Sequence, residues 1–289
     1  MKLVTYQINE ETTVGAIIED QRIVPLTTVA PDMLSLIESG SEGLERAQSV
    51  VAAATETILL ENVRLLAPIP IPRRNIMCLG KNYAAHAEES HRAWGDKVEL
   101  PKFPLFFTKS TTTVNGPYDD IPYNSNVSTA IDFEAELLVI IGQAGKNITR
   151  KQAMAHVFGY SIMNDVTARD LQRQHKQFFK GKSLDGHAPM GPWIVTTSEI
   201  PNPHNLRVSC HVNGQEKQNG NTNQMIFDIS ETIAQLSLGM SLLPGDLIAT
   251  GTPSGVGFAR TPPEFLKPGD VVTCSVEGIG SIRNRIAPQ

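Results

Sequence analysis

The sequence predicts an α+β protein in which a small N-terminal α/β unit, residues 1–67, precedes a larger, β-rich unit, residues 75–289. Three observations support this prediction. The N-terminal unit begins with alternating polarity, as a half-buried strand does, and then carries a helix-like apolar pattern. The Pro-rich segment P-I-P-I-P-R-R, residues 68–74, cannot continue a helix and predicts a stiff connector. The second half of the larger unit reads as short strands, with Asn213-Gly214 as a hairpin turn signal.

Length and composition indicate a globular protein with a large core. Of the 289 residues, 40% are hydrophobic and 19% are charged, and the formal net charge is −5, which argues against disorder and against a nucleic-acid surface. Cys78, Cys210 and Cys274 are widely spaced, so neither a disulfide framework nor a zinc site is predicted and a reducing, cytoplasmic setting fits best. No apolar run reaches the roughly 18 residues of a membrane span, so no membrane partner is expected.

The N-terminal unit reads as a strand over residues 2–7, a hairpin over residues 15–26 and a helix over residues 33–54. None of these segments carries a pattern that points to chemistry. The larger unit then opens with the strand N-I-M-C-L-G, residues 75–80, and the helix-like stretch K-N-Y-A-A-H-A-E-E-S-H-R-A-W, residues 81–94. We therefore look for functional residues from this helix onward.

The helix predicted over residues 81–94 carries a candidate catalytic pair. His86 and Glu89 are three positions apart, so a helix places them on one face within contact distance. Such a pair could share a proton and activate a water molecule. An ordinary solvent-exposed helix face is the alternative, because charged side chains are mostly exposed. Residues 90–102, which overlap the end of this helix and are loop-like from Arg92 onward, are predicted to act as a mobile lid.

An acidic strand is the first candidate metal site. In I-D-F-E-A-E-L-L-V-I-I-G, Glu134 and Glu136 are two positions apart, so on a strand both point the same way from an apolar run. Burying two like charges side by side requires a compensating cation. Asp165, after the next apolar run, is the predicted third ligand, and three carboxylates favour Mg²⁺ before Mn²⁺ or Ca²⁺. A solvated strand face, with Asp165 as a helix cap, is the alternative.

Further positions are candidate ligand contacts. Arg169 and Gln172 are spaced to share a helix face and offer a guanidinium and an amide to an anion, unless Arg169 only forms a surface ion pair. Lys182, if near the three acids, keeps its charge and holds a substrate carboxylate or enolate; otherwise it is a solvent-facing loop lysine. A helix capped by Ser230 precedes a glycine-rich loop around Thr252, whose N–H groups could approach a ligand closely.

Six blocks in one order resemble the fumarylacetoacetate hydrolase family over about residues 74–286. The blocks are G-K-N-Y-x-x-H-x-x-E, D-F-E-x-E-L-x-V-x-I-G, N-D-V-T-A-R-D-L-Q, G-K-S-x-D, N-T-N-Q-M and T-G-T-P-x-G-V-G. They are most similar to the branch that contains acylpyruvate hydrolases, oxaloacetate decarboxylases and oxaloacetate tautomerases. The resemblance implies a β-rich mixed roll or sandwich behind a smaller N-terminal domain, often assembled as a homodimer.

The resemblance also implies roles for the candidate residues, with Mg²⁺ or Mn²⁺ as the cofactor. Each role is carried over only to the position that matches the family's motif. The roles are metal ligation for Glu134, Glu136 and Asp165, catalysis for His86, Glu89 and Lys182, and substrate binding for Arg169, Gln172 and Thr252.

The implied reaction is hydrolysis of the C3–C4 bond of a 2,4-dioxo acid of the acylpyruvate type, with a metal-bound pyruvate enolate as the leaving group. Hydrolysis is preferred because the water-activating pair of His86 and Glu89 is intact. The alternative applies the same enolate chemistry to oxaloacetate tautomerisation or decarboxylation, or to isomerisation of a hydroxymuconate-type diacid. A binding protein whose ion is structural is the rival outside the enzymes. The expected partner is a small 2-oxo or 2,4-dioxo acid.

Overall fold

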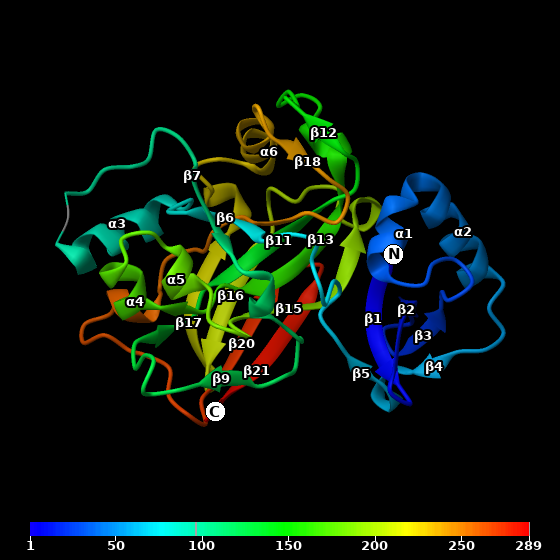
Figure 1. Cartoon of the computed structure of the whole chain (residues 1–289), viewed down its shortest axis with the longest axis horizontal. Helices are drawn as coiled ribbons and strands as arrows, with labels where there is room; N and C mark the ends of the chain where they lie inside the picture. The colour runs from blue at the N-terminus through cyan, green and yellow to red at the C-terminus, as the bar shows by residue number, and fades with distance from the viewer. Residues whose placement is uncertain (96, 289) are drawn as a thin grey trace.

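The computed structural model describes residues 1–95 and 97–288, and its centre is a large mixed β-sheet (Figure 1). Strands from both predicted units contribute to this sheet. They are β1 (Lys2–Ile8), β2 (Glu11–Ile18), β3 (Arg22–Pro25), β4 (Ile58–Leu59), β5 (Arg64–Leu65), β6 (Ile76–Gly80), β7 (Leu105–Lys109), β8 (Val114–Asn115), β11 (Ala135–Ile141), β13 (Val157–Asn164), β15 (Ala188–Thr196) and β19 (Leu247–Ala249).

The strand order of the large sheet joins the N-terminal unit to the rest of the chain. The order is β4-β3-β2-β1-β15-β13-β11-β19-β6-β7, with β5 beside β1 and β8 beside β15. Strand β1 pairs antiparallel with β15, so that Lys2 lies opposite Val195 and Leu3 opposite Ile194. The N-terminal strands therefore extend the central sheet, and the domain boundary at residues 68–74 stays a prediction.

A second sheet, in the order β17-β16-β20-β21-β9, packs against the central strands. Asn213 and Gly214 have φ angles of 51° and 79°, as the primed turn of a two-residue hairpin requires, which confirms the predicted hairpin. The strands of this sheet are β9 (Ile121–Tyr123), β16 (Arg207–Val212), β17 (Gln215–Asn221), β20 (Val271–Val276) and β21 (Gly280–Pro288).

Strand β11 is buried on both faces, which explains its continuous apolar run. Leu137, Val139 and Ile141 belong to the core between the two sheets. Leu138 and Ile140 point into the core on the opposite side, which also contains residues of β1 and of the N-terminal helices. Packing on both faces therefore fixes the position of β11, which directly follows Glu134 and contains Glu136.

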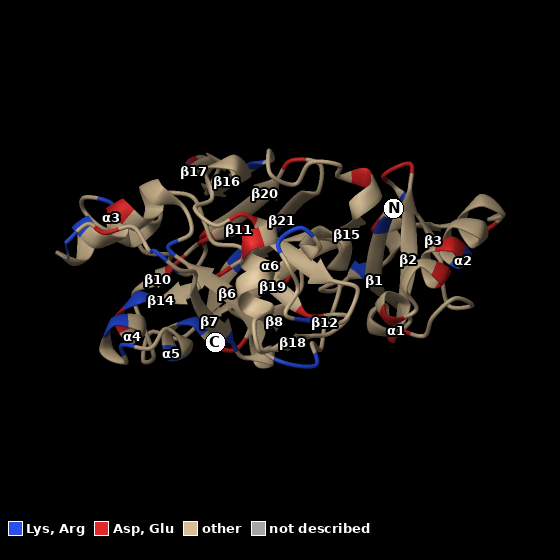
Figure 2. Cartoon of the chain, turned by 90° about the horizontal axis from the view of Figure 1, so that it is seen from above, with Lys and Arg blue, Asp and Glu red and all other residues tan. Residues whose placement is uncertain are grey.

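Helices α1 and α2 lie at one end of the molecule and α3, α4 and α5 at the other, and α6 lies between the two ends (Figure 1, Figure 2). Short paired strands and single 3₁₀ turns complete the fold. The remaining elements are α1 (Met33–Glu38), α2 (Gly40–Ala52), α3 (Ala84–Trp94), α4 (Arg169–Gln174), α5 (Phe179–Lys182), α6 (Ile229–Ser237), β10 (Ile131–Asp132), β12 (Gly145–Lys146), β14 (Thr167–Ala168), β18 (Ser241–Leu242), η1 (Leu60–Asn62), η2 (Thr111–Thr113), η3 (Ala153–His156), η4 (Thr197–Glu199), η5 (Thr222–Gln224) and η6 (Gly257–Ala259).

These elements confirm the predicted α+β class and correct several local predictions. The helix expected over residues 33–54 is divided at Gly40, whose φ of +59° is left-handed. Residues 90–94 of the predicted lid are the last turn of α3, which ends at the left-handed Gly95, and residue 96 lies outside the described residues. Helix α6 is capped by Asp228 and not by Ser230. None of the helices in residues 1–95 and 97–288 is long and apolar enough to cross a membrane.

Candidate active site

The three acids predicted as metal ligands converge beside the central sheet. Glu134 lies in the gap between β10 and β11, Glu136 is in β11, and Asp165 directly follows β13. Because β11 and β13 are antiparallel, with Glu136 opposite Met163, the end of β13 returns to the start of β11. One carboxylate oxygen from each acid lies within 4.8 Å of the other two, and all three side chains are buried. A solvated strand face is therefore excluded.

Two buried lysines contact this acidic triad. The Nζ of Lys182, at the end of α5, lies 2.8 Å from Glu134 Oε2 and 2.7 Å from Asp165 Oδ2. Lys109, the last residue of β7, donates to Asp165 Oδ1 at 2.7 Å and to the Val166 carbonyl oxygen at 3.0 Å. Lys182 is thus not a solvent-facing loop residue. Sequence reasoning assigned no role to Lys109, although a lysine that closes an apolar strand run is an unusual pattern.

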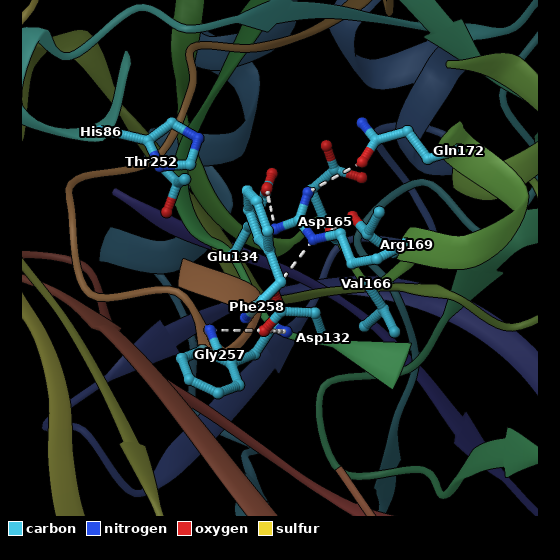
Figure 3. A network of polar contacts seen from close by, with 12 residues as sticks. His86, Asp132, Glu134, Asp165, Val166, Arg169, Gln172, Thr252, Gly257 and Phe258 are labelled. Carbon is cyan, nitrogen blue, oxygen red and sulfur yellow. Dashed lines mark hydrogen bonds and ion pairs between the residues drawn. The ribbon is translucent and has the colours of Figure 1, made fainter. Parts of the chain in front are cut away.

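Arg169 and Gln172 share a face of α4, as their spacing predicted, and both are buried. Arg169 uses all three guanidinium nitrogens within the protein: Nε donates to Asp132 at 2.9 Å, one Nη to Glu134 at 2.6 Å and the other to Gln172 Oε1 at 3.1 Å (Figure 3). The surface ion pair considered for Arg169 is therefore wrong. Sequence reasoning missed Asp132, although it stands two positions before Glu134 in the same alternating pattern.

Glu136 is the least compensated member of the triad. Burial and then the negative charges of Asp165 and Glu134 raise the pKa of Glu136 well above its ordinary value. Burial acts in the same direction on Glu134, but Lys182 and Arg169 outweigh it and hold the pKa of Glu134 below its ordinary value. The neighbouring cations thus compensate Glu134 and leave negative charge at Glu136 without equal compensation.

This arrangement fits a divalent cation. Two oxygens on opposite sides of one Mg²⁺ or Ca²⁺ ion are roughly 4 to 5 Å apart, which matches the spread of the triad. A ligand set of Glu134, Glu136 and Asp165 contains oxygen only, which hard cations such as Mg²⁺ and Mn²⁺ prefer. A cation among these oxygens would also relieve the repulsion that raises the pKa of Glu136.

The predicted pair on α3 is formed. His86 Nδ1 lies 2.9 Å from Glu89 Oε1, and His86 is only 6% exposed, so this is not an ordinary exposed helix face. Both carboxylate oxygens of Glu89 also accept the Gly255 N–H, at 3.0 and 2.9 Å. Gly255 has a φ of +109°, and a Cβ there would lie 2.1 Å from the Lys217 carbonyl oxygen, so the loop requires glycine. The glycine-rich loop therefore orients the His–Glu pair.

Thr252 lies on the same loop, but its hydroxyl is engaged within the protein. It donates to the Ala135 carbonyl oxygen at 2.9 Å and accepts the Gln218 amide at 2.8 Å. In this structure the Thr252 hydroxyl holds the glycine-rich loop against β11.

Six of the nine candidate residues line one small cavity, in which about 20 Å³ is accessible to the centre of a water-sized sphere, and Glu89, Glu136 and Asp165 are not among its lining residues. Its polar side chains come from the elements described above, and its apolar walls come mainly from aromatic residues. The lining residues that bear on function are Lys81, His86, Ser90, Trp94, Phe107, Glu134, Arg169, Gln172, Phe178, Lys182, Thr252 and Phe258.

Fold and sequence together define an enzyme of the fumarylacetoacetate hydrolase family. The chain belongs to this family, because the model for the fumarylacetoacetate (FAA) hydrolase C-terminal region matches residues 75–287. It is 42% identical to oxaloacetate tautomerase YisK of Bacillus subtilis, covering 99% of this chain and 100% of that relative. The solved fumarylacetoacetate hydrolase of Exiguobacterium antarcticum matches with a TM-score of 0.86 and 39% identity and covers 100% of both chains.

A second solved relative shows what a protein of this fold can hold. Maleylpyruvate hydrolase from a Sphingobium strain, in complex with manganese(II) ion and pyruvate, matches with a TM-score of 0.80 and 28% identity. The match covers 100% of this chain and 99% of that chain.

Proposed function

We propose that this protein is a divalent-metal-dependent tautomerase that interconverts the keto and enol forms of oxaloacetate. The observation that carries the proposal is that His86, paired with Glu89, and Lys182 line the same cavity as Glu134 of the acidic triad. The name of the Bacillus relative supports oxaloacetate as the substrate. Tautomerisation therefore replaces hydrolysis, which the sequence alone favoured, as the leading reaction.

The chain supplies a proton carrier and a cation for this reaction. A divalent ion held by the acidic triad would supply Lewis-acid polarisation of the keto group. His86, with Nδ1 held by Glu89, presents Nε2 as the base that takes a proton from C3 of the substrate and returns it to the enolate oxygen. Glu89 fixes the ring and stabilises its protonated form, and the ammonium of Lys182 stabilises negative charge that develops on the substrate.

Hydrolysis of an acylpyruvate is the second candidate, and the intact His86–Glu89 pair favours it because the pair could equally activate water. The manganese and pyruvate in the maleylpyruvate hydrolase structure support the same ion and a related leaving group. Decarboxylation of oxaloacetate would use the same enolate chemistry. Mg²⁺ or Mn²⁺ as the native ion, a homodimeric assembly and a cytoplasmic location all remain predictions.

The test follows enol-oxaloacetate by ultraviolet absorbance with Mg²⁺, with Mn²⁺ and with EDTA, while coupled assays detect pyruvate from oxaloacetate and from acetopyruvate. We expect metal-dependent loss of the enol without equivalent pyruvate. Glu89→Gln removes the group that supports the base and should slow the reaction by about 10²- to 10⁴-fold. Glu88→Gln, on the exposed side of the same helix, is the matched control. Unchanged rates for Glu89→Gln, or no tautomerisation with either metal, would overturn the proposal.

A further inference from the structure

Asp132, the last residue of β10, is a fully buried carboxylate whose two oxygens accept four hydrogen bonds. Oδ1 accepts the backbone N–H groups of Phe133 and Gly257, at 2.9 and 2.8 Å. Oδ2 accepts the backbone N–H of Phe258 at 3.1 Å and the Nε–H of Arg169 at 2.9 Å. Three backbone groups thus fix the carboxylate of Asp132, and its fourth contact is to the side chain of Arg169.

The Phe258 ring contacts the guanidinium of Arg169 from a second direction. The Arg169 Cζ lies over the ring, 4.3 Å from its centre, a position in which the ring attracts a cation. The Phe258 N–H and the Arg169 Nε–H donate to the same oxygen of Asp132, so this oxygen fixes the spacing between the ring and the guanidinium (Figure 3). Asp132 and Phe258 therefore form a cradle that holds the guanidinium at one edge and at one face.

The cradle leaves the two Nη atoms of Arg169 beside the acidic triad. One Nη donates to Glu134 at 2.6 Å and the other to Gln172 at 3.1 Å, so Arg169 directly contacts a predicted metal ligand. A guanidinium has five N–H groups, and Arg169 uses three of them in hydrogen bonds to Asp132, Glu134 and Gln172. Among the residues that the structure describes, one N–H group on each Nη is left for an anion in the cavity, which Arg169 lines.

We propose that Asp132, together with the Phe258 ring, is a positioning residue that orients the Arg169 guanidinium toward the 2-oxo carboxylate of the substrate. The inference rests on the proposed function, in which this carboxylate lies beside the acidic triad. Holding a long side chain in its binding conformation before the ligand arrives removes the entropy cost of ordering it during binding. Among the described residues Asp132 does not line the cavity, so its effect on a ligand acts through Arg169.

The test is a double-mutant cycle in which oxalate, a mimic of the enolate of a 2-oxo acid, is titrated calorimetrically into the Mn²⁺-loaded proteins. We expect Asp132→Asn to weaken oxalate binding by about 10- to 100-fold, the range of a hydrogen bond to a charged group, because an amide turns N–H groups toward donors. Arg169→Met should weaken oxalate binding at least as much. The double variant should bind oxalate no more weakly than Arg169→Met alone, because both changes remove the same contact.

Asp170→Asn is the matched control for the loss of a carboxylate. Asp170 is next to Arg169 on α4, but it is exposed and accepts the Ser128 hydroxyl at 2.7 Å. This variant should keep the wild-type affinity for oxalate. Titration of Mn²⁺ alone is the second control, because Asp132→Asn leaves the acidic triad intact and should keep the affinity for the ion. A parallel loss of Mn²⁺ and oxalate binding in Asp132→Asn would count against a positioning role.

Phe258→Leu tests the other side of the cradle and is more conservative for folding. Leucine keeps apolar packing at this position, and the backbone N–H of residue 258 still donates to Asp132. We expect oxalate binding to weaken by about 3- to 10-fold, the range of a cation–π contact, with no further loss when Arg169→Met is already present. If thermal unfolding shows that Asp132→Asn does not fold, Phe258→Leu decides the question, and unchanged oxalate affinity overturns the inference.

The possible outcomes separate this inference from the proposed function. Wild-type oxalate affinity in Asp132→Asn, or a loss that adds to the loss in Arg169→Met, overturns the positioning role and leaves the tautomerase proposal standing. If the cycle is non-additive as expected and the wild type nevertheless converts no enol-oxaloacetate, the positioning role is supported and the proposed function is overturned.

Discussion

Replacement of Lys182 by methionine tests whether the Lys182 ammonium supplies, in the metal-free protein, the positive charge that a bound metal ion would supply to the acidic triad. Lys182 is 2% exposed and contacts two acids of the triad. Removing one partner of a buried ion pair costs about 3 to 5 kcal/mol. Here Glu134 keeps Arg169 and Asp165 keeps Lys109, so the lower value, about 3 kcal/mol, is expected. For a chain of 289 residues this corresponds to a fall in Tm of about 5 °C.

The decisive measurement is calorimetric unfolding of wild type and Lys182→Met, each in EDTA and in Mn²⁺. In EDTA we expect the Tm of Lys182→Met to be about 5 °C below that of wild type. In Mn²⁺ we expect the two Tm values to be nearly equal, because the ion supplies the missing positive charge to the same carboxylates. For the same reason Lys182→Met should bind Mn²⁺ more tightly than wild type, whose ammonium competes with the ion. Weakened substrate or enolate-mimic binding should accompany this change.

Two variants serve as controls for this prediction. Lys109→Met also removes a contact of Asp165, but it leaves the Val166 carbonyl oxygen without its donor, so its destabilisation should persist in Mn²⁺. Lys97→Met changes a side chain that is 86% exposed and should leave Tm unchanged. The reasoning is refuted if Lys182→Met loses the same Tm in EDTA and in Mn²⁺, or if its affinity for Mn²⁺ falls.

Two further predictions follow from the same structure. Glu136→Ala should weaken Mn²⁺ binding at least tenfold in a calorimetric titration, because it removes one of the three carboxylates that would hold the ion; unchanged affinity would remove Glu136 from the ligand set. Burial lowers the pKa of His187 from 6.5 to about 4, so its neutral ring contributes stability that is present above pH 6.5 and lost as pH falls toward 4. This contribution is up to about 3 kcal/mol, and His187→Gln should flatten urea-unfolding free energies over that range; an unchanged pH slope would contradict the assignment.

Local spacing in the sequence determined a large part of the candidate site. The spacing of two positions predicted that Glu134 and Glu136 lie together, although Glu134 falls just before β11, and the helical period predicted that His86 lies beside Glu89, because both relationships depend on backbone geometry within a few residues. The Asn213-Gly214 turn was predictable for the same reason. The order of six sequence blocks supplied the family, which the match to residues 75–287 confirms.

Tertiary structure decided what spans long distances along the chain. Asp165 reaches Glu134 only because β13 pairs antiparallel with β11, and strand order cannot be read from local periodicity. The burial of Lys109 against Asp165 joins residues 56 positions apart. The full engagement of Arg169 by internal partners likewise depends on packing between distant elements, since no spacing rule relates α4 to β10. The candidate residues were thus predictable from the sequence, whereas the fold determined which of them line the cavity.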